Sequence, residues 1–146
     1  MPEKDYSHRH VTDKLGLKPG FVVRAVGRGD KDLLARVHEK IGRAVSRSDK
    51  TPADVILYWP KSAGEITGTL IELKTAIVAN GGIWVITAKR GLPGYINQDS
   101  VIPLGLAAGL VDNKICSLSD EESAMRFVIR KENRKQRKQR KFPLFP

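Results

Sequence analysis

The stretch FVVRAVGRGDKDLLARV, residues 21–37, runs from an apolar segment through two glycines into a helix-like pattern. Residues 21–26 are rich in β-branched side chains and predict a strand. The apolar positions that follow recur at helical spacing: Leu33, Leu34, Val37 and Ile41. Asp30 precedes them, where an N-cap residue is favoured. A strand, a glycine-containing loop and a helix in this order are typical of a nucleotide-binding turn.

Strand-like and helix-like segments alternate after this unit. ADVILYWP at residues 53–60 and IWVITA at residues 83–88 are apolar runs with little alternation, as expected of strands covered on both faces. Between them a helix is predicted by apolar residues spaced four, three and four apart, Ile66, Leu70, Leu73 and Ile77. We expect this helix to stop at the Asn-Gly-Gly of residues 80–82.

The remaining part of the body predicts a short helix and a hairpin. Asp99 is a capping candidate and Gly109 a terminating residue, which would place Pro103 in the first turn of the helix. Residues 111–118 and 124–131 predict two strands joined by a tight acidic connection, and therefore antiparallel to each other.

These elements predict an α/β fold with a single three-layer domain. We expect an open, mostly parallel sheet with right-handed crossovers, helices on both faces and a C-terminal antiparallel hairpin. We assign residues 1–13 to a flexible N-terminal arm, residues 14–130 to the domain and residues 131–146 to a disordered basic tail.

The composition limits the possible classes of protein. A length of 146 residues suits one domain, and the lone Cys116 rules out an internal disulfide framework. No apolar run approaches the roughly 20 residues that a membrane-spanning helix needs. The polar N-terminus does not resemble a secretory signal. We therefore expect a cytoplasmic protein.

Several segments carry a family resemblance. Four segments resemble, in order, the core of Rossmann-like methyltransferases: LKPGFVVRAVG, ADVILYWP, LIELKTAIVANGGIWVITAKR, and AAGLVDNKICSL with AMRFVIRK. Roughly one strand-helix unit of that core is missing between Gly42 and Asp54. KLGLKPG, GGIWVITAKRGLPGYINQDSVIP and AAGL more closely resemble a family of uncharacterised, largely actinobacterial proteins known only as a domain of unknown function. That resemblance covers about residues 13–130. It implies a truncated methyltransferase-like fold and no established activity.

The glycines of residues 27–29 depart from the cofactor loops that this fold suggests. By the resemblance, a methyltransferase loop would carry an acidic residue where this chain has Ala25 and a third glycine where it has Lys31. The dinucleotide fingerprint fails as well, because its third glycine position is Asp32. Gly27, Arg28 and Gly29 remain the candidate cofactor-binding residues, but two glycines on such a turn also serve turn geometry alone.

A weaker nucleotide signal lies at residues 45–49, VSRSD. This segment could be the end of a second strand, where Arg47 meets a ribose phosphate or Asp49 meets ribose hydroxyls. We expect no bound cofactor.

Ligands of open parallel sheets bind beyond the carboxyl ends of the strands, and the sequence places basic residues there. The candidate anion-binding residues are Arg28, Lys61, Lys89 and Arg90, and the candidate stacking residues are Trp59 and Tyr95. Such a group suits a phosphate, a carboxylate or a nucleic-acid backbone. The alternative is that the basic residues only solubilise loop ends while Trp59 packs in the core.

No catalytic or metal-binding constellation emerges from the remaining chemically reactive residues. His8 and His10 fall in the N-terminal arm, and His38 falls on the first predicted helix. Cys116 is expected to be a small core residue, and Asp54 lies at the wrong end of its strand for catalysis. We interpret SDEES at residues 119–123 as a solvated turn.

The C-terminal tail repeats RKQRKQRK, and its charges would spiral around a helix instead of forming one face. We expect it to contact nucleic acid without sequence specificity through Arg134, Lys135, Arg137, Lys138, Arg140 and Lys141. Phe142, Leu144 and Phe145 form an apolar tip that could dock on a protein partner. The alternative is a solvated extension with no partner.

The sequence thus favours a non-catalytic Rossmann-like binding protein with an anion-binding crevice and a tail that contacts nucleic acid. An S-adenosylmethionine-dependent methyltransferase-like or nucleotide-dependent enzyme with an atypical Gly loop is the alternative. A scaffold that recruits a partner protein through its apolar tip is a third possibility.

Overall fold

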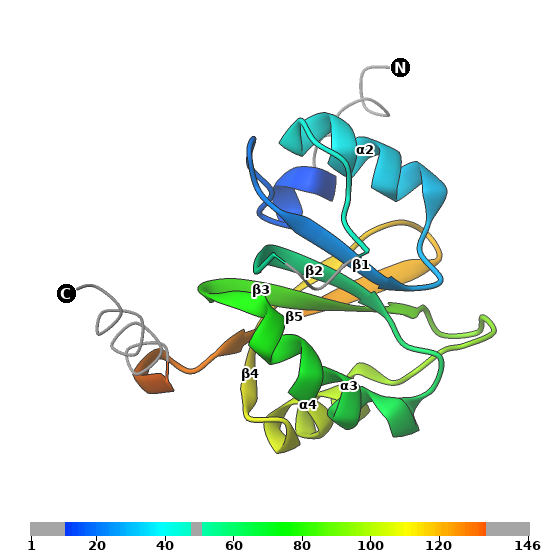
Figure 1. Ribbon diagram of the computed structural model, residues 1–146. Helices are drawn as coiled ribbons and strands as arrows, with labels where there is room; N and C mark the ends of the chain where they lie inside the picture. The colour runs from blue at the N-terminus through cyan, green and yellow to red at the C-terminus, as the bar shows by residue number, and fades with distance from the viewer. Residues whose placement is uncertain (1–10, 48–50, 134–146) are drawn as a thin grey trace.

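The computed structural model describes residues 11–47 and 51–133 and contains one five-stranded sheet (Figure 1). In chain order the strands are β1 (Val23–Gly27), β2 (Ala53–Trp59), β3 (Ile77–Ala88), β4 (Leu110–Ser117) and β5 (Glu122–Ile129). Their order across the sheet is β1-β2-β3-β5-β4. β1, β2 and β3 pair in parallel, whereas β5 is antiparallel to both β3 and β4. The predicted α/β fold with a closing antiparallel hairpin is confirmed.

Helices cover both faces of the sheet, which gives three layers (Figure 1). The helices are α2 (Lys31–Ile41), α3 (Ile66–Leu73) and α4 (Gln98–Ala107). On one face, Val37 of α2 belongs to a buried cluster with Leu57 and Trp84. On the other face, α3 and α4 cover a cluster that includes Ile83 and Phe127. We refer to these as the α2 face and the α3/α4 face.

A helical turn at residues 11–14 packs on the α2 face and belongs to the folded body. Thr12 is 5% exposed, and Leu15 and Leu17 join the buried cluster. The indole Nε1 of Trp84 donates a hydrogen bond to the carbonyl of Leu15 at 3.1 Å. Residues 11–13, which the sequence assigned to the arm, therefore lie within or beside packed structure.

The predicted start of α2 is confirmed. The Asp30 side chain accepts a hydrogen bond from the Leu33 N–H at 3.2 Å, as an N-cap residue does. Gly42 ends the helix with φ 78°, and its N–H donates to the His38 carbonyl. After α2, the described residues before β2 form one isolated parallel bridge, between Ser46 and Arg24 at the outer edge of β1.

The prediction for the second helix is wrong at its C-terminal end. α3 ends at Leu73 and a 3-10 turn follows, so that Ile77 begins β3 and residues 80–82 lie inside this strand. Ile77 pairs with Ala53 of β2, so it lies in the sheet although its spacing fits the helical pattern. Gly82 lies under the Arg126 side chain, where a Cβ would have no room. The glycines permit close approach within the sheet and do not stop a helix.

The start of α4 also differs from the prediction. Asn97, not Asp99, is the N-cap residue, and its Oδ1 accepts from the Asp99 N–H at 2.8 Å. Pro103 lies inside the helix and not in its first turn. Its ring nitrogen cannot donate to the Asp99 carbonyl, so the helix loses one internal hydrogen bond there.

The described helices are all too short or too polar to cross a lipid bilayer.

Two helix glycines predict opposite effects on stability. A Cβ at Gly105 of α4 would collide with the buried ring of Phe127 on β5, whereas a Cβ at Gly68 of α3 would meet nothing within 4 Å. We expect Gly105→Ala to lower the free energy of unfolding by about 1 to 3 kcal/mol, because the packed contact cannot accept a methyl group. Gly68→Ala should raise it by about 0.5 to 1 kcal/mol through helix propensity. Urea unfolding followed by circular dichroism measures both.

Gly68→Ala is the matched control, since both changes place alanine inside a helix. An equal gain in stability for the two variants would contradict the close α4–β5 contact.

Candidate binding pocket at the carboxyl edge of the sheet

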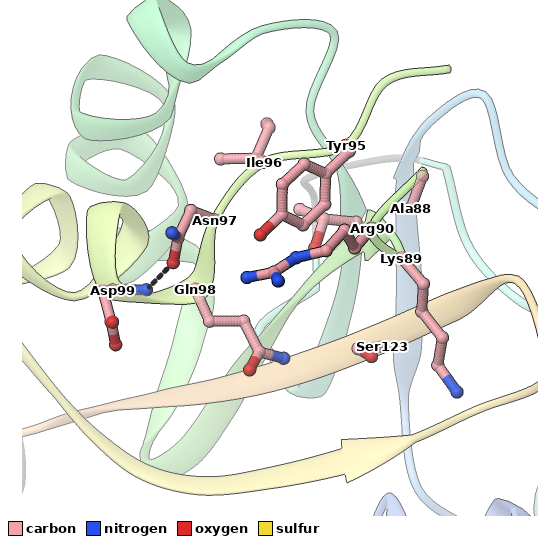
Figure 2. A pocket seen from close by; sticks show the side chains of 10 residues that line it. Ala88, Lys89, Arg90, Tyr95, Ile96, Asn97, Gln98, Asp99 and Ser123 are labelled. Atoms are coloured by element: carbon pink, nitrogen blue, oxygen red, sulfur yellow. Dashed lines mark hydrogen bonds between the residues drawn. The ribbon is translucent and has the colours of Figure 1, made fainter. Parts of the chain in front are cut away.

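A pocket of about 340 Å³ lies at the carboxyl end of β3 (Figure 2). Its size falls within the range of small-molecule sites. The end of β3, the loop at residues 89–97, the first turn of α4 and Ser123 of β5 line it. Thr87 pairs with Ser123, and both alternate with residues of the α2 face, so that they point to the α3/α4 face. The pocket therefore opens on the α3/α4 side of the sheet.

The loop at residues 89–97 holds Tyr95 at the mouth of this pocket. Gly91 and Gly94 have φ values of 89° and 84°, which let the loop turn twice. The Leu92 N–H donates to the Lys89 carbonyl at 3.2 Å, and the Tyr95 N–H donates to the Leu92 carbonyl at 3.1 Å. Tyr95 also forms an isolated parallel bridge with Ala88. These bonds fix the backbone of Tyr95, and the residue is 38% exposed.

Arg90 supplies the positive charge of the pocket. Its guanidinium lies near the centre of the lining residues in Figure 2, below the Tyr95 ring in that view. Within the described ranges it has neither an ion pair nor a hydrogen bond. Lys89 extends away from this centre, and its ammonium donates to the Ser117 Oγ on β4 at 2.6 Å. Arg90 is therefore the cation that a ligand would meet.

The first turn of α4 provides the polar wall. The Asn97 Oδ1 accepts from the Asp99 N–H, and the amide nitrogen of Asn97 has two N–H donors that can serve a ligand. Gln98 is half-buried and has both a donor and an acceptor. Asp99 and Lys89 lie at opposite ends of the group in Figure 2. The pocket thus has a positive centre and an acidic end.

The Gly loop, residues 27–29, is closed by the chain itself. A Cβ at Gly27 would collide with the Trp59 carbonyl, and φ is 100° there, so the glycine allows β1 to end close against β2. The Arg47 Nη1 donates to the Gly27 carbonyl at 2.9 Å, and its other Nη lies 3.1 Å from the Cβ position of Gly29. Arg47 thus lies on the loop instead of standing free for a ribose phosphate. Asp49 is outside the described residues.

The four predicted anion-binding cations do not gather at one site. Arg28 pairs with Glu122 at 3.0 Å, and the side chains are 77% and 11% exposed. Glu122 alternates with Ser123, so this ion pair lies on the α2 face, opposite to the pocket. Lys61 is exposed and does not line the pocket. Arg90 and Lys89 remain beside it.

Trp59 does not provide the flat stacking surface that the sequence suggested. It is 4% exposed and packs in the α2-face core, as the alternative interpretation expected. Its Nε1 is buried and lacks a partner with hydrogen-bond geometry among the described residues, although the indole is near enough to lower the pKa of Glu122. Tyr95 is the one predicted stacking residue that lines the pocket.

Glu122 is the residue that the sequence interpretation missed most clearly. Residues 119–121 are exposed, as a solvated turn requires, but Glu122 is buried at the start of β5. Burial raises the pKa of its carboxyl group, and the Arg28 guanidinium opposes that rise. The available signal was its position two residues before Ala124, which puts both side chains on the same, buried face of the strand.

The remaining reactive residues form no second site in the part of the chain that the structure describes. No three His, Cys, Asp or Glu side chains come together there as a metal site would need. His38 is exposed, and burial raises the pKa of the half-buried Cys116. Asp54 accepts a hydrogen bond from the Val22 N–H at 2.8 Å, which is a structural role.

The tail residues that were predicted to contact nucleic acid or a protein lie outside the described residues. They are Arg134, Lys135, Arg137, Lys138, Arg140, Lys141, Phe142, Leu144 and Phe145.

A comparison with protein families matches residues 12–131 to a family described as "Protein of unknown function (DUF3052)". Uncharacterised proteins of Mycobacterium tuberculosis and Mycobacterium bovis are each 28% identical over 120 residues, which is 79% of this chain and 75% of theirs. The predicted resemblance to an uncharacterised family is confirmed.

Solved structures show the same fold at low identity. A SAM dependent methyltransferase from Aquifex aeolicus superposes with a TM-score of 0.66 at 17% identity and covers 84% of this chain and 89% of its own. The pyocyanin biosynthetic protein PhzM gives a TM-score of 0.65 at 12% identity, over 87% of this chain and 55% of its own. The methyltransferase-like fold that the sequence implied is confirmed, and at these identities the likeness concerns the fold alone.

The buried Glu122 predicts a pH dependence of stability. Its pKa is raised in the folded protein, so the folded state holds the proton more tightly than the unfolded chain does. The associated stabilisation is present below the ordinary pKa of glutamate and is lost as pH rises through the raised pKa. The free energy of unfolding of the wild type minus that of Glu122→Gln should therefore fall as the pH is raised from below to above the ordinary pKa of glutamate, about 4.3.

Urea unfolding at several pH values across this range measures the difference, with Glu39→Gln on the exposed side of α2 as the control. A difference that stays constant or rises with pH would show that the carboxyl group is not desolvated.

Proposed function

The chain belongs to the DUF3052 family of proteins of unknown function, and we propose that it is a non-catalytic binding protein that holds an anionic group at Arg90. The observation that carries this proposal is an Arg90 guanidinium that has no partner among residues 11–47 and 51–133, in a pocket of about 340 Å³. An arginine fork suits the planar oxygens of phosphate and carboxylate. The two N–H donors of the Asn97 amide add to the preference for an acceptor-rich ligand.

The Gly loop supports the non-catalytic part of the proposal. Ala25 and Lys31 stand where the methyltransferase pattern has an acid and a glycine. Arg47 occupies the Gly27 carbonyl, and the Trp59 carbonyl closes the space beside the Gly27 Cα. A cofactor in this loop would have to displace a charged side chain that is already bonded.

An S-adenosylmethionine-dependent enzyme is the second candidate, favoured by the fold that the chain shares with methyltransferases. Thermal denaturation with S-adenosylmethionine and with its demethylated product separates the two candidates. Saturable stabilisation of the wild type by either compound, lost in the Gly29→Val variant, would favour the enzyme over the binding protein. Arg47 is unchanged in this variant.

The Arg90 proposal predicts a localised response to inorganic phosphate. In a titration followed by two-dimensional ¹H–¹⁵N NMR, the amide signals of residues 88–99 should shift and saturate. Arg90→Gln should weaken the apparent affinity about tenfold or more, because a charged hydrogen-bond donor is lost. Shifts spread over the whole surface, or unchanged by Arg90→Gln, would refute the site.

Arg43→Gln is the matched control for this titration. Arg43 is exposed and follows the C-cap of α2, and that end of the helix contacts Gly20 at the opposite edge of the sheet. Its loss removes the same charge and should leave the phosphate affinity unchanged within twofold.

We also propose that the basic tail contacts nucleic acid, because residues 131–146 hold seven Lys or Arg against one Glu. Cations that neutralise phosphates release counterions, so binding should weaken steeply with salt, with a slope of about −5 to −6 in log affinity against log salt if all seven engage. Fluorescence anisotropy with a single-stranded oligonucleotide measures this slope. Deletion of residues 134–146 should flatten it, and an unchanged slope would assign the binding to the body.

A further inference from the structure

We infer that the pocket at Arg90 takes a nucleotide, with the base against the Tyr95 ring and the phosphate at the Arg90 guanidinium. This inference rests on the proposed function, because it assigns a ligand class to the same anion site. It is carried by an aromatic wall, a cation without a partner among the described residues and a polar edge, which meet in one cavity.

Tyr95 provides the surface for the base. The bridge to Ala88 and the turn from Leu92 fix its backbone, so its ring is presented without ordering the loop on binding. Each of the common nucleobases has a flat face that can stack on an aromatic side chain. Ile96, half-buried beside it, adds apolar contact to the same wall.

The first turn of α4 provides groups for the edge of the base. Asn97 has two amide donors, Gln98 has a donor and an acceptor, and Asp99 has acceptors. A nucleobase edge carries both ring acceptors and amino or imino donors, and such an edge matches this mixture. A simple phosphate or carboxylate ion would use the donors but would leave Asp99 as a repulsive neighbour.

The charges set the direction of the ligand. Asp99 lies at the end of the pocket away from Lys89, with Arg90 between them (Figure 2). A phosphate is attracted by Arg90 and repelled by Asp99, so it takes the Arg90 side, and the base points its amino groups toward Asp99. Lys89, held by Ser117, adds positive charge on the phosphate side.

The nucleotide can be free or part of a strand, since Tyr95 and Arg90 are exposed and leave the pocket open. Both sources present the same base and phosphate. A free mononucleotide needs only the pocket, whereas a strand would engage the tail as well.

Titration of the full-length protein by ¹H–¹⁵N NMR tests the inference with inorganic phosphate, with the four common nucleoside 5′-monophosphates and with a short single-stranded oligonucleotide. We expect at least one monophosphate to bind tenfold or more tightly than phosphate and to shift the signals of residues 88–99. Tyr95→Leu should remove this advantage and leave the phosphate affinity within twofold. Arg90→Gln should weaken phosphate and monophosphate alike.

Leu92→Ala is the matched control, because Leu92 is exposed on the same loop and does not line the pocket. It should bind like the wild type, and wild-type signals away from the pocket show that each variant is folded. Monophosphates that bind no better than phosphate would overturn the nucleotide inference and leave the anion site standing. If the wild-type signals of residues 88–99 respond neither to phosphate nor to any monophosphate, both the anion site and the nucleotide inference are overturned.

Among the sources, an oligonucleotide that shifts the pocket signals at lower concentration than the monophosphates identifies a strand as the ligand. Equal or weaker shifts identify the free nucleotide. An oligonucleotide affinity that Tyr95→Leu leaves unchanged, with no monophosphate preference, counts against a nucleotide in the pocket.

Discussion

The burial of β3 on both faces is the constraint from which the rest of the structure follows. Every residue from Gly81 to Thr87 is buried, so apolar side chains of this strand point alternately into two different layers. Trp84 faces α2 and the N-terminal turn, whereas Ile83 and Val85 face α3 and α4. A strand of this kind cannot lie at an edge or face water, because either would expose a large apolar area. β3 therefore has to lie in the interior of the sheet, and helices have to cover both faces of the sheet.

The packing of α4 on the α3/α4 face also determines where the pocket lies. α4 approaches β5 closely because Gly105 leaves room for the Phe127 ring, and this contact fixes the axis of the helix over the hairpin. The first turn of α4 then lies beyond the end of β3, joined to it by the loop at residues 89–97. Tyr95, Arg90 and Asn97 come together as a result of chain geometry, since the loop is too short to carry them elsewhere. The packing of α4 thus leaves a pocket at the end of β3, and polar side chains line this pocket.

The sequence predicts the elements that have one local cause and fails where two causes compete. The apolar runs at 53–60 and 83–88 and the capped helix after Asp30 were predicted because propensity, pattern and capping agree. Ile77 satisfied a helical spacing, yet pairing with Ala53 in the sheet decides its conformation. The Asn-Gly-Gly of residues 80–82 carries a turn signal, yet those glycines serve close packing under Arg126.

The candidate site shows the same division. That basic residues follow the strands could be predicted, because the carboxyl ends of parallel strands share one edge. Which face of the sheet each side chain takes could not, because it depends on strand register and on partners far along the chain. Arg28 turns to Glu122, which is 94 residues away, and Lys89 turns to Ser117. Arg90 has no such partner in the part of the chain that the structure describes, and it lines the pocket with Tyr95.

The Gly loop and the pocket lie on opposite sides of the same sheet edge, so that the two are structurally separate. Gly27 is required for β1 to approach the Trp59 carbonyl, so the glycine would be kept whether or not a cofactor binds. Arg47 donates to the Gly27 carbonyl in a loop whose positive φ values at Gly27 and Gly29 already serve packing and turning. Arg90 lies across the sheet beside α4, away from this loop. The two glycines are therefore explained by how β1 and β2 pack and by how the loop turns, with or without a cofactor.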